Sequence, residues 1–263
     1  MKVGVFRGDD NDPLVIKAID AFVDGLQYLG LDYFYEGEEY QPCDVAVVWG
    51  IASQRFYDKT AYRDVIRAKQ PNTIVLERGF IKRDKYFAAG WDDTGGRADF
   101  CNAGSPPDRW ERLNIKMKPW KEGGDYILVL GQIPWDTSVQ HIDYSKWLCE
   151  TIDQLVATGD PVVFRNHPKL SVPFGPFEKV YPSSGSLEED LVGASVVVTC
   201  NSTSAVDATL AGVQVVPADG RCMVPQGPFD REQWARDIAY TQWRLHEFRK
   251  GLAFKHLIEG RGL

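Results

Sequence analysis

The sequence predicts an α/β protein of two Rossmann-like, doubly wound domains that face a cleft. Three observations support this class. Short β-branched runs alternate with amphipathic helical patterns in both halves of the chain. A Gly/Pro-rich stretch at residues 90–125 separates the halves. Polar side chains follow the strand-like runs, where open α/β sheets bind ligands. We expect one domain at residues 1–122, and a second domain with a closing C-terminal helix at residues 123–263.

The elements of the first half follow this rhythm in order. The run KVGVF favours a strand, and Pro13 stands at the first position of a helix whose apolar residues recur at helical spacing. Two strand-like runs, a helical pattern and a further strand-like run complete the half: LDYFYEG (31–37), DVAVVWG (44–50), DKTAYRDVIRAKQ (58–70) and NTIVLERG (72–79).

The second half restarts the alternation and predicts a doubly wound sheet of its own. Its helical patterns include SLEE, which matches the S-x-x-E capping box that begins a helix. The expected strands are YILVLGQ (126–132), PVVFRNHP (161–168), SVVVTCN (195–201) and VQVVPAD (213–219), and the expected helices are YSKWLCETIDQLVAT (144–158), SLEEDLVGA (186–194) and SAVDATLAG (204–212).

Composition narrows the function classes. The chain has 263 residues and a formal net charge of -7, which gives no general attraction to nucleic acid or anionic membranes. No apolar run is long enough to span a membrane, and five scattered cysteines suggest neither disulfides nor a thiolate zinc site, so we expect a cytoplasmic protein. Residues 55–121 hold fifteen Lys or Arg and nine Asp or Glu. This local excess indicates either an anionic ligand or a solvated mixed-charge surface.

The junction NSTS, residues 201–204, is a candidate anion site. Asn201, Ser202, Thr203 and Ser204 lie between a predicted strand and a predicted helix, where the first backbone N–H groups of the helix lack partners. Hydroxyls there can add hydrogen bonds to a phosphate. The same residues can instead cap the helix, and both interpretations stay open.

Two other strand ends of the second half carry polar groups. Arg165 and His167 end a buried strand, and a guanidinium beside an imidazole suits a diphosphate or a carboxylate. Gln132 and Asp136 follow the first strand of this half; the alternative is a polar loop in which Asp136 caps a helix. We expect these strand ends to converge on one crevice.

Residues 126–255 resemble the C-terminal domain of GT-B glycosyltransferases of the capsular polysaccharide biosynthesis, Kdo-transferase-like type. The resemblance rests above all on R-x-HP at residues 165–168 and N-S-T-S-A at residues 201–205. It implies that residues 123–263 form a nucleotide-sugar-binding domain opposite an acceptor-side domain at residues 1–122. Within the former, Arg165, His167 and residues 201–204 would hold the phosphate of the sugar nucleotide. Asp207 would meet the ribose or the sugar, or could equally lie on the helix surface. The chain departs from the pattern in its short length and in Asn166. The segment ERGF…R, residues 77–83, is similar to one in bacteriophage-encoded members.

Glycosyl transfer with inversion needs a general base opposite the donor, together with positive groups that stabilise the departing phosphate. The candidates for the base are Glu77, which ends a strand, and Asp10, whose alternative role is charge compensation at a helix N-terminus. Asp9, Asp92 and Asp93 are weaker candidates. The expected acceptor-side residues are Arg78, Arg83 and Trp49. A Trp in a strand is more often part of the core, and Arg78 and Arg83 can instead form a salt bridge with Glu77.

The sequence therefore predicts a metal-independent glycosyltransferase with no cofactor beyond its nucleotide-sugar co-substrate. No H-E-x-x-H motif, P-loop or G-x-S-x-G elbow is present. The acceptor hydroxyl belongs to a glycan or, for a phage-derived chain, to a hydroxymethylated DNA base. The alternatives are a two-lobed protein that binds a nucleotide or phosphosugar without catalysis, and a sugar-nucleotide epimerase of GT-B fold.

Overall fold

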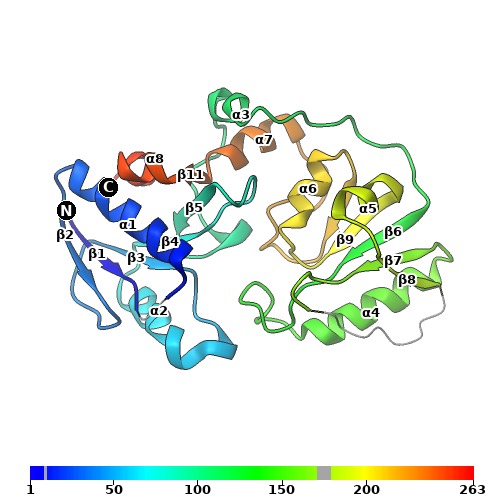
Figure 1. Cartoon of the computed structure of the whole chain (residues 1–263), viewed down its shortest axis with the longest axis horizontal. Coiled ribbons are helices and arrows are strands. Elements are labelled where there is room, and N and C mark those ends of the chain that lie inside the picture. Colours follow the sequence, from blue (N-terminus) through cyan, green and yellow to red (C-terminus); the bar gives the residue numbers. More distant parts are fainter. Residues whose placement is uncertain (9–10, 171–178) are drawn as a thin grey trace. The chain divides into compact units, whose positions relative to one another are not determined.

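The computed structural model describes residues 1–8, 11–170 and 179–263. The chain forms two compact units (Figure 1). Unit 1 contains Met1–Asn114 and Asp230–Leu263, and unit 2 contains Ile115–Phe229. Each unit is built around its own mostly or wholly parallel sheet, which confirms the predicted α/β class.

Unit 1 is built on a six-stranded sheet, sheet A, in the order β11-β5-β4-β3-β1-β2. The four strands at one side pair in parallel, whereas β5 and β11 are antiparallel additions. The order β2-β1-β3-β4 is the beginning of a flavodoxin-like sheet, whose switch point lies between β1 and β3. The strands are β1 (Lys2–Phe6), β2 (Asp32–Glu36), β3 (Val45–Trp49), β4 (Thr73–Arg78), β5 (Tyr86–Trp91) and β11 (Gln242–Arg244).

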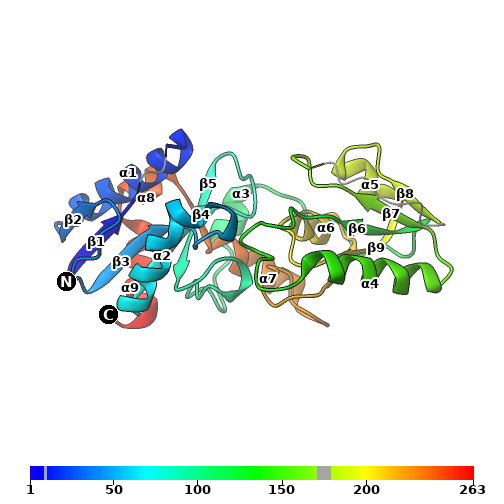
Figure 2. The same cartoon turned by 90° about the horizontal axis from the view of Figure 1, so that it is seen from below.

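Helices cover both faces of sheet A (Figure 2). Helix α1 (Pro13–Tyr28) begins after Asp12, whose side chain accepts a hydrogen bond from the Leu14 N–H, and packs Ile19 and Phe22 on one face. Helix α2 (Tyr57–Lys69) packs Ile66 on the other face. Short segments η1 (Gln54–Phe56), η2 (Gly95–Arg97) and α3 (Asp108–Leu113) complete this part of the unit.

The C-terminal segment belongs to unit 1, whereas we predicted it within the second domain. It contains α7 (Arg231–Ala239), β11, α8 (Leu245–Arg249) and α9 (Leu252–Arg261). Strand β11 extends sheet A, and Phe248 and Leu257 complete the core around α1. The predicted boundary missed this return because hydrophobic periodicity identifies an element but does not say which sheet it joins.

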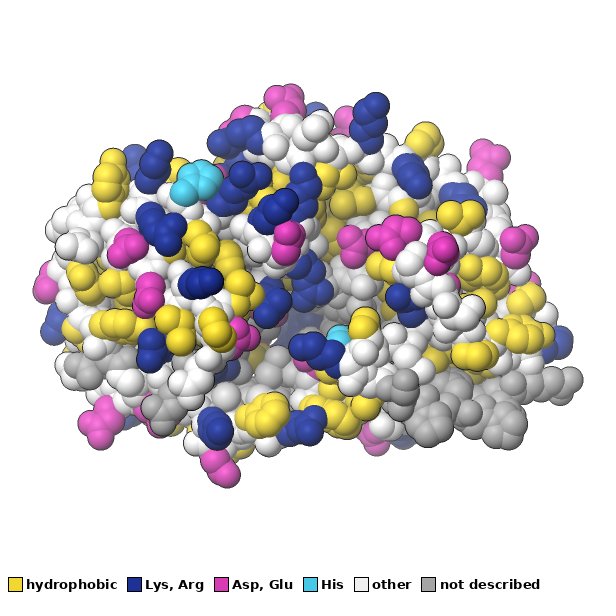
Figure 3. Space-filling model, in the orientation of Figure 1, with side chains coloured by type: hydrophobic (Ala, Val, Ile, Leu, Met, Phe, Trp, Pro, Cys, Tyr) yellow, Lys and Arg dark blue, Asp and Glu magenta, His cyan; other side chains and the backbone are white. Residues whose placement is uncertain are grey.

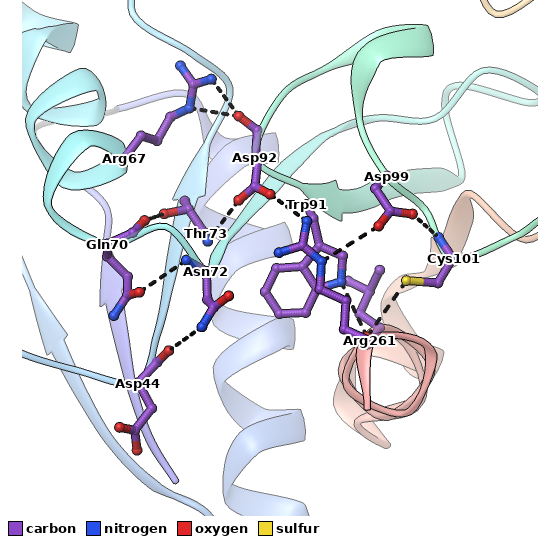
Figure 4. Close-up of polar contacts among 11 residues, drawn as sticks. Asp44, Arg67, Gln70, Asn72, Thr73, Trp91, Asp92, Asp99, Cys101 and Arg261 are labelled. Atoms are coloured by element: carbon purple, nitrogen blue, oxygen red, sulfur yellow. Dashed lines mark hydrogen bonds and ion pairs between the residues drawn. The ribbon is translucent and has the colours of Figure 1, made fainter. Parts of the chain in front are cut away.

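Helix α9 is held against the end of β5 by polar contacts (Figure 4). The Arg261 guanidinium lies 4.4 Å from the Trp91 ring centre and pairs with Asp92 and Asp99. The Trp91 indole N–H donates to the Leu257 carbonyl at 3.3 Å. Asp92, one of the weaker candidates for the base, is therefore part of the contact that fixes the C-terminal helix.

Unit 2 is built on a five-stranded parallel sheet, sheet B, in the order β10-β9-β6-β7-β8. Numbered within the unit, this order is 5-4-1-2-3, the arrangement of the first five strands of a Rossmann sheet. The switch point lies between β6 and β9, because the chain winds from β6 toward one edge and from β9 toward the other. The strands are β6 (Tyr126–Leu130), β7 (Val162–Arg165), β8 (Val180–Pro182), β9 (Ala194–Thr199) and β10 (Gln214–Pro217).

Helices again sandwich the sheet, with α4 on one side of the strands and α5 on the other in Figures 1 and 2. Helix α4 (Tyr144–Ala157) packs Leu148 and Ile152 against one face. Helices α5 (Leu187–Gly193) and α6 (Ser204–Leu210) pack Leu191 and Ala208 against the other face. The predicted capping box of α5 is formed by Ser186 and Glu189.

Candidate functional site

The loops that follow β6, β9 and β10 meet at the carboxyl edge of sheet B. Gln132 lies two residues after β6, Asn201 two residues after β9, and Asp219 two residues after β10. Because β6 and β9 flank the switch point, this is the edge at which Rossmann-like sheets bind ligands.

Gln132 and Asn201 form the centre of a hydrogen-bond network at this edge. Gln132 Nε2 donates to Asn201 Oδ1 at 2.7 Å and to Ser138 Oγ at 3.3 Å, and the Asn201 backbone N–H donates to Gln132 Oε1 at 3.0 Å. Asn201 Nδ2 donates to the Ser138 carbonyl and to Asp219 Oδ2. Both residues are less than a tenth exposed. Since each amide nitrogen already makes two hydrogen bonds, these side chains hold the loops in place for the site.

The network also includes His141, Asp219 and Arg221, which were not among the predicted site residues. His141 Nε2 lies 3.0 Å from Asp219 Oδ2, and Arg221 Nη1 donates to the Thr137 carbonyl at 3.0 Å. Asp219 ends the predicted strand 213–219, so the expectation that polar residues at strand ends form the site could have identified it. His141 has no such signal, because its contact with Asp219 depends on β10 lying beside β9.

Residues Ser202 to Ser204 form the turn between β9 and α6. The Ser202 N–H donates to Thr199 Oγ1 at 3.2 Å, and the Ser204 N–H donates to Ser202 Oγ at 3.3 Å. Thr203 makes no side-chain cap, and within the described residues no partner is found for its backbone N–H or for the hydroxyls of Thr203 and Ser204. The turn thus combines partial capping by Ser202, whose hydroxyl only accepts, with four donors that have no partner among the described residues: the Thr203 N–H and the hydroxyls of residues 202–204.

Arg165 ends β7, as predicted, but its side chain is directed to α5. Arg165 Nη1 donates to Asp190 Oδ2 at 2.7 Å, to the Gly185 carbonyl at 2.7 Å and to Ser183 Oγ at 3.1 Å. Asp190 is 7% exposed. The ion pair therefore joins β7 to α5, and at least this end of the guanidinium is used within the protein.

The remaining predicted donor-side residues occupy different places. His167 follows β7 and is half-buried; its Nδ1 accepts from the Lys169 N–H, which leaves the ring proton on Nε2 when the ring is neutral. Asp136 accepts from the Ser138 N–H and hydroxyl, and so orders the loop after β6. Asp207 is exposed and lines a separate 540 Å³ pocket with Lys116.

Buried groups beside the network stay protonated at neutral pH. Burial raises the pKa of Tyr144, whose hydroxyl accepts from the Gln132 N–H at 2.7 Å, to about 12. Burial likewise raises the pKa of Cys200 to about 12. The Cys200 thiol therefore supplies no thiolate nucleophile at this edge of the sheet.

Of the predicted acceptor-side residues, Trp49 reaches a pocket at the carboxyl edge of sheet A. It ends β3, its ring meets the Phe87 ring edge-on at 6.3 Å, and it lines a 410 Å³ pocket with Asp12, Lys59 and Arg63. Trp49 thus contributes to both the core and the pocket.

The other predicted residues of the first half are less closely grouped. Arg78 Nη2 lies 3.8 Å from Asp12 Oδ2, which brings Arg78 to the rim of the same pocket. Glu77 is half-buried near the end of β4, and Arg83 is exposed in the following turn. Asp10 and Asp9 lie outside the described residues.

Comparisons with known proteins identify the fold. No protein-family model and no curated protein matches the chain. Among solved structures, the KpsC β-Kdo 2,4-transferase of Thermosulfurimonas dismutans aligns with a TM-score of 0.57 at 13% identity, covering 90% of this chain and 89% of that one. The β-Kdo 2,7-transferase of KpsC from the same organism aligns with a TM-score of 0.56 at 13% identity, covering 97% and 99%.

The chain has the fold of these transferases. The prediction of two Rossmann-like domains of GT-B type is confirmed at this level. Among the described residues, no helix is long and apolar enough to cross a membrane.

Proposed function

We propose that the protein is a glycosyltransferase that moves a sugar from a nucleotide-sugar donor to a hydroxyl acceptor. The observation that carries the proposal is the turn of Ser202, Thr203 and Ser204 at the switch point of sheet B. This turn offers donors to an anion at the edge where such sheets bind ligands. The shared fold with two Kdo transferases is consistent with it.

The donor phosphate is assigned to the turn after β9. Hydroxyl and backbone N–H donors that are already positioned cost little reorganisation when negative charge develops on the leaving phosphate. In this proposal Gln132 and Asn201 act as positioning residues, since their amides are used in joining the loops. His167 and the part of the Arg165 guanidinium beyond its contact with Asp190 are the candidates for further contacts with the phosphate.

Catalysis is assigned to a carboxylate of unit 1. Glu77 and Asp10 remain the candidates for the base that takes the acceptor proton, and Trp49, Arg78 and Arg83 are the candidates for contacts with the acceptor. We propose transfer that needs no metal ion. The acceptor is a glycan or a hydroxymethylated DNA base.

The first test is nucleotide binding. We expect calorimetry with UDP-, GDP-, dTDP-, ADP- and CMP-linked sugars to find one donor class. Because hydrogen bonds to charged groups are worth about 1.5–3 kcal/mol each, the double change Ser202→Ala/Ser204→Ala should weaken that donor at least tenfold. Ser195→Ala is the matched control, since Ser195 is half-buried at the opposite end of β9 and bonds the Tyr126 carbonyl.

The structure also indicates how much folding stability the double variant Ser202→Ala/Ser204→Ala should lose. Within the described residues, Ser202 Oγ accepts one hydrogen bond of 3.3 Å and the Ser204 hydroxyl none, so the loss of stability should stay within about 1 kcal/mol. A large loss of stability with unchanged donor affinity would show that the turn only caps α6, and the proposal would fail.

Turnover separates the enzyme from the alternative function. Once the donor is identified, turnover is measured as release of free nucleotide in the presence of glycans or of hydroxymethylated DNA. We expect one of the variants Glu77→Gln and Asp10→Asn, the one that removes the general base, to abolish this release and to keep the donor affinity. Tight donor binding without turnover on any acceptor would instead favour a non-catalytic nucleotide-binding protein.

A further inference from the structure

We infer that unit 1 contains a binding site for a phosphate monoester in a cationic pocket formed by α3, β5, β11 and α8. The pocket has a volume of 280 Å³, and all of its lining residues belong to unit 1, whereas the turn proposed to bind the donor belongs to unit 2. Its lining residues are Tyr86, Arg109, Arg112, Leu113, Ala239, Arg244, His246 and Glu247. The inference goes beyond the proposed function, because it holds whether or not the protein transfers a sugar.

The pocket lies at the ligand-binding edge of sheet A. Strand β5 runs antiparallel to β4, so Phe87 near the start of β5 pairs with Arg78 at the end of β4. Tyr86 pairs in turn with Arg244 at the end of β11. Tyr86 and Arg244 therefore stand at the same edge as the carboxyl ends of the parallel strands, where α/β sheets bind ligands.

Arg244 and Tyr86 present unused donors to this pocket. Arg244 Nε donates to the Tyr86 hydroxyl at 3.0 Å, and the guanidinium lies 5.1 Å from the Tyr86 ring centre. Among the described residues, the two terminal nitrogens of Arg244 have no hydrogen-bond partner, and the Tyr86 hydroxyl has no acceptor for its own proton. Tyr86 is only 6% exposed. The Tyr86 hydroxyl and the terminal nitrogens of Arg244 can therefore donate hydrogen bonds to the oxygen atoms of an anionic ligand.

The wall behind these donors is rigid. Arg109 donates to Glu247 at 2.7 and 3.2 Å, to the Ala239 carbonyl at 3.1 Å and to the Gln242 carbonyl at 2.7 Å. Burial raises the pKa of Glu247, but hydrogen bonds from Arg109 and its charge more than offset this, and the pKa falls below its usual value. Glu247 therefore stays ionised, and its backbone partner is the Arg244 N–H, at 2.8 Å.

The charge around the pocket fits a phosphate monoester better than a carboxylate. Arg109, Arg112 and Arg244 line it, and Lys82 binds the carbonyl of the lining residue Leu113. Glu247 is the carboxylate that lines the pocket, and Asp108 beside it pairs with Arg112 at 2.7 Å. Three lining arginines against one lining carboxylate leave an excess of two positive charges, close in size to the charge of a phosphate monoester, about -1.5 to -2 at neutral pH.

The surface view agrees with this charge count. Figure 3 shows Lys and Arg side chains gathered over α3, β11 and α8. The Arg112–Asp108 pair is exposed, with side-chain exposures of 62% and 52%, so it is weak enough for Arg112 to turn toward an incoming phosphate.

Calorimetry of the full chain with methyl phosphate tests the inference. We expect saturable binding at one site, with acetate binding at least tenfold more weakly because it carries one charge. Arg244→Gln should weaken methyl phosphate by about tenfold or more, and Tyr86→Phe by about three- to tenfold. The matched control is Arg249→Gln, which removes the same charge from α8 at an exposed residue that pairs with Asp24 outside the pocket.

Each outcome decides between this site and another explanation. If Arg249→Gln and Arg244→Gln lose equal affinity for methyl phosphate, the ligand is attracted only by the general surface charge. If acetate binds as tightly as methyl phosphate, the site does not select a phosphate. Either result refutes the inference, as does the absence of binding heat with wild-type protein at millimolar methyl phosphate. Tyr86→Phe keeps the test valid if Arg244→Gln fails to fold. Methyl phosphate affinity should be unchanged in Ser202→Ala/Ser204→Ala, and sugar-nucleotide affinity unchanged in Arg244→Gln, so the two proposals can fail separately.

Discussion

Replacing Arg109 by Met should destabilise unit 1 strongly. Arg109 lies on α3, and its partners lie on the C-terminal segment: Glu247, Gln242 and the Ala239 carbonyl. The side chains of Arg109 and Glu247 are only 7% and 9% exposed. The guanidinium also lies 3.9 Å from the Trp243 ring centre. Methionine keeps the aliphatic part of the side chain but removes every one of these polar contacts.

The magnitude follows from the charge that remains. Without Arg109, the Glu247 carboxylate stays buried. Among the described residues, the hydrogen bond that remains to it is the one from the Arg244 backbone N–H, at 2.8 Å. Removing one partner of a buried ion pair costs about 3–5 kcal/mol. Since each kcal/mol lowers the melting temperature of a chain of this size by roughly 2–4 °C, we expect a decrease of about 6–20 °C.

Scanning calorimetry measures this decrease, and Arg112→Met is the control. Arg112 lies on the same helix and also pairs with a carboxylate, Asp108, but both side chains are more than half exposed. Such exposed pairs contribute about 0–1 kcal/mol. The double variant Arg109→Met/Glu247→Leu should recover much of the lost stability because it removes the stranded charge. Equal effects of Arg109→Met and Arg112→Met would refute the reasoning.

Three further predictions concern other parts of the chain. Gln132→Leu should lower the stability of unit 2 by about 2–4 kcal/mol in urea unfolding, because it removes the partners of the buried Asn201 Oδ1 and Asn201 backbone N–H; a neutral effect would contradict the network. Burial lowers the pKa of His256, so the unfolded state takes up a proton first; stability should fall as pH decreases from about 6.5, and this slope should disappear in His256→Gln. Gly212→Ala should be destabilising in thermal unfolding, since φ is +82° and the new Cβ would lie 2.0 Å from the Pro119 carbonyl oxygen; an unchanged melting temperature would mean that the loop moves freely.

The sequence by itself determined the alternation of strands and helices and the residues that follow each strand. Apolar periodicity is local, so runs such as 126–132 and 195–201 could be recognised as strands without knowledge of their neighbours. The expectation that the polar strand ends converge placed Gln132 and Asn201 at one edge of the sheet. The structure shows the two side chains hydrogen-bonded to each other at 2.7 Å. Their roles in donor binding remain predictions.

Only the tertiary structure decided which distant segments meet. The return of residues 230–263 to unit 1, the direction of Arg165 toward Asp190 and the contact of His141 with Asp219 all join residues far apart in the chain. Each depends on the order of strands in a sheet. Spacing along the sequence specifies which face of an element is apolar, but not which partner covers that face. The free energy gained per unit of buried apolar area is about the same for any well-packed apolar neighbour.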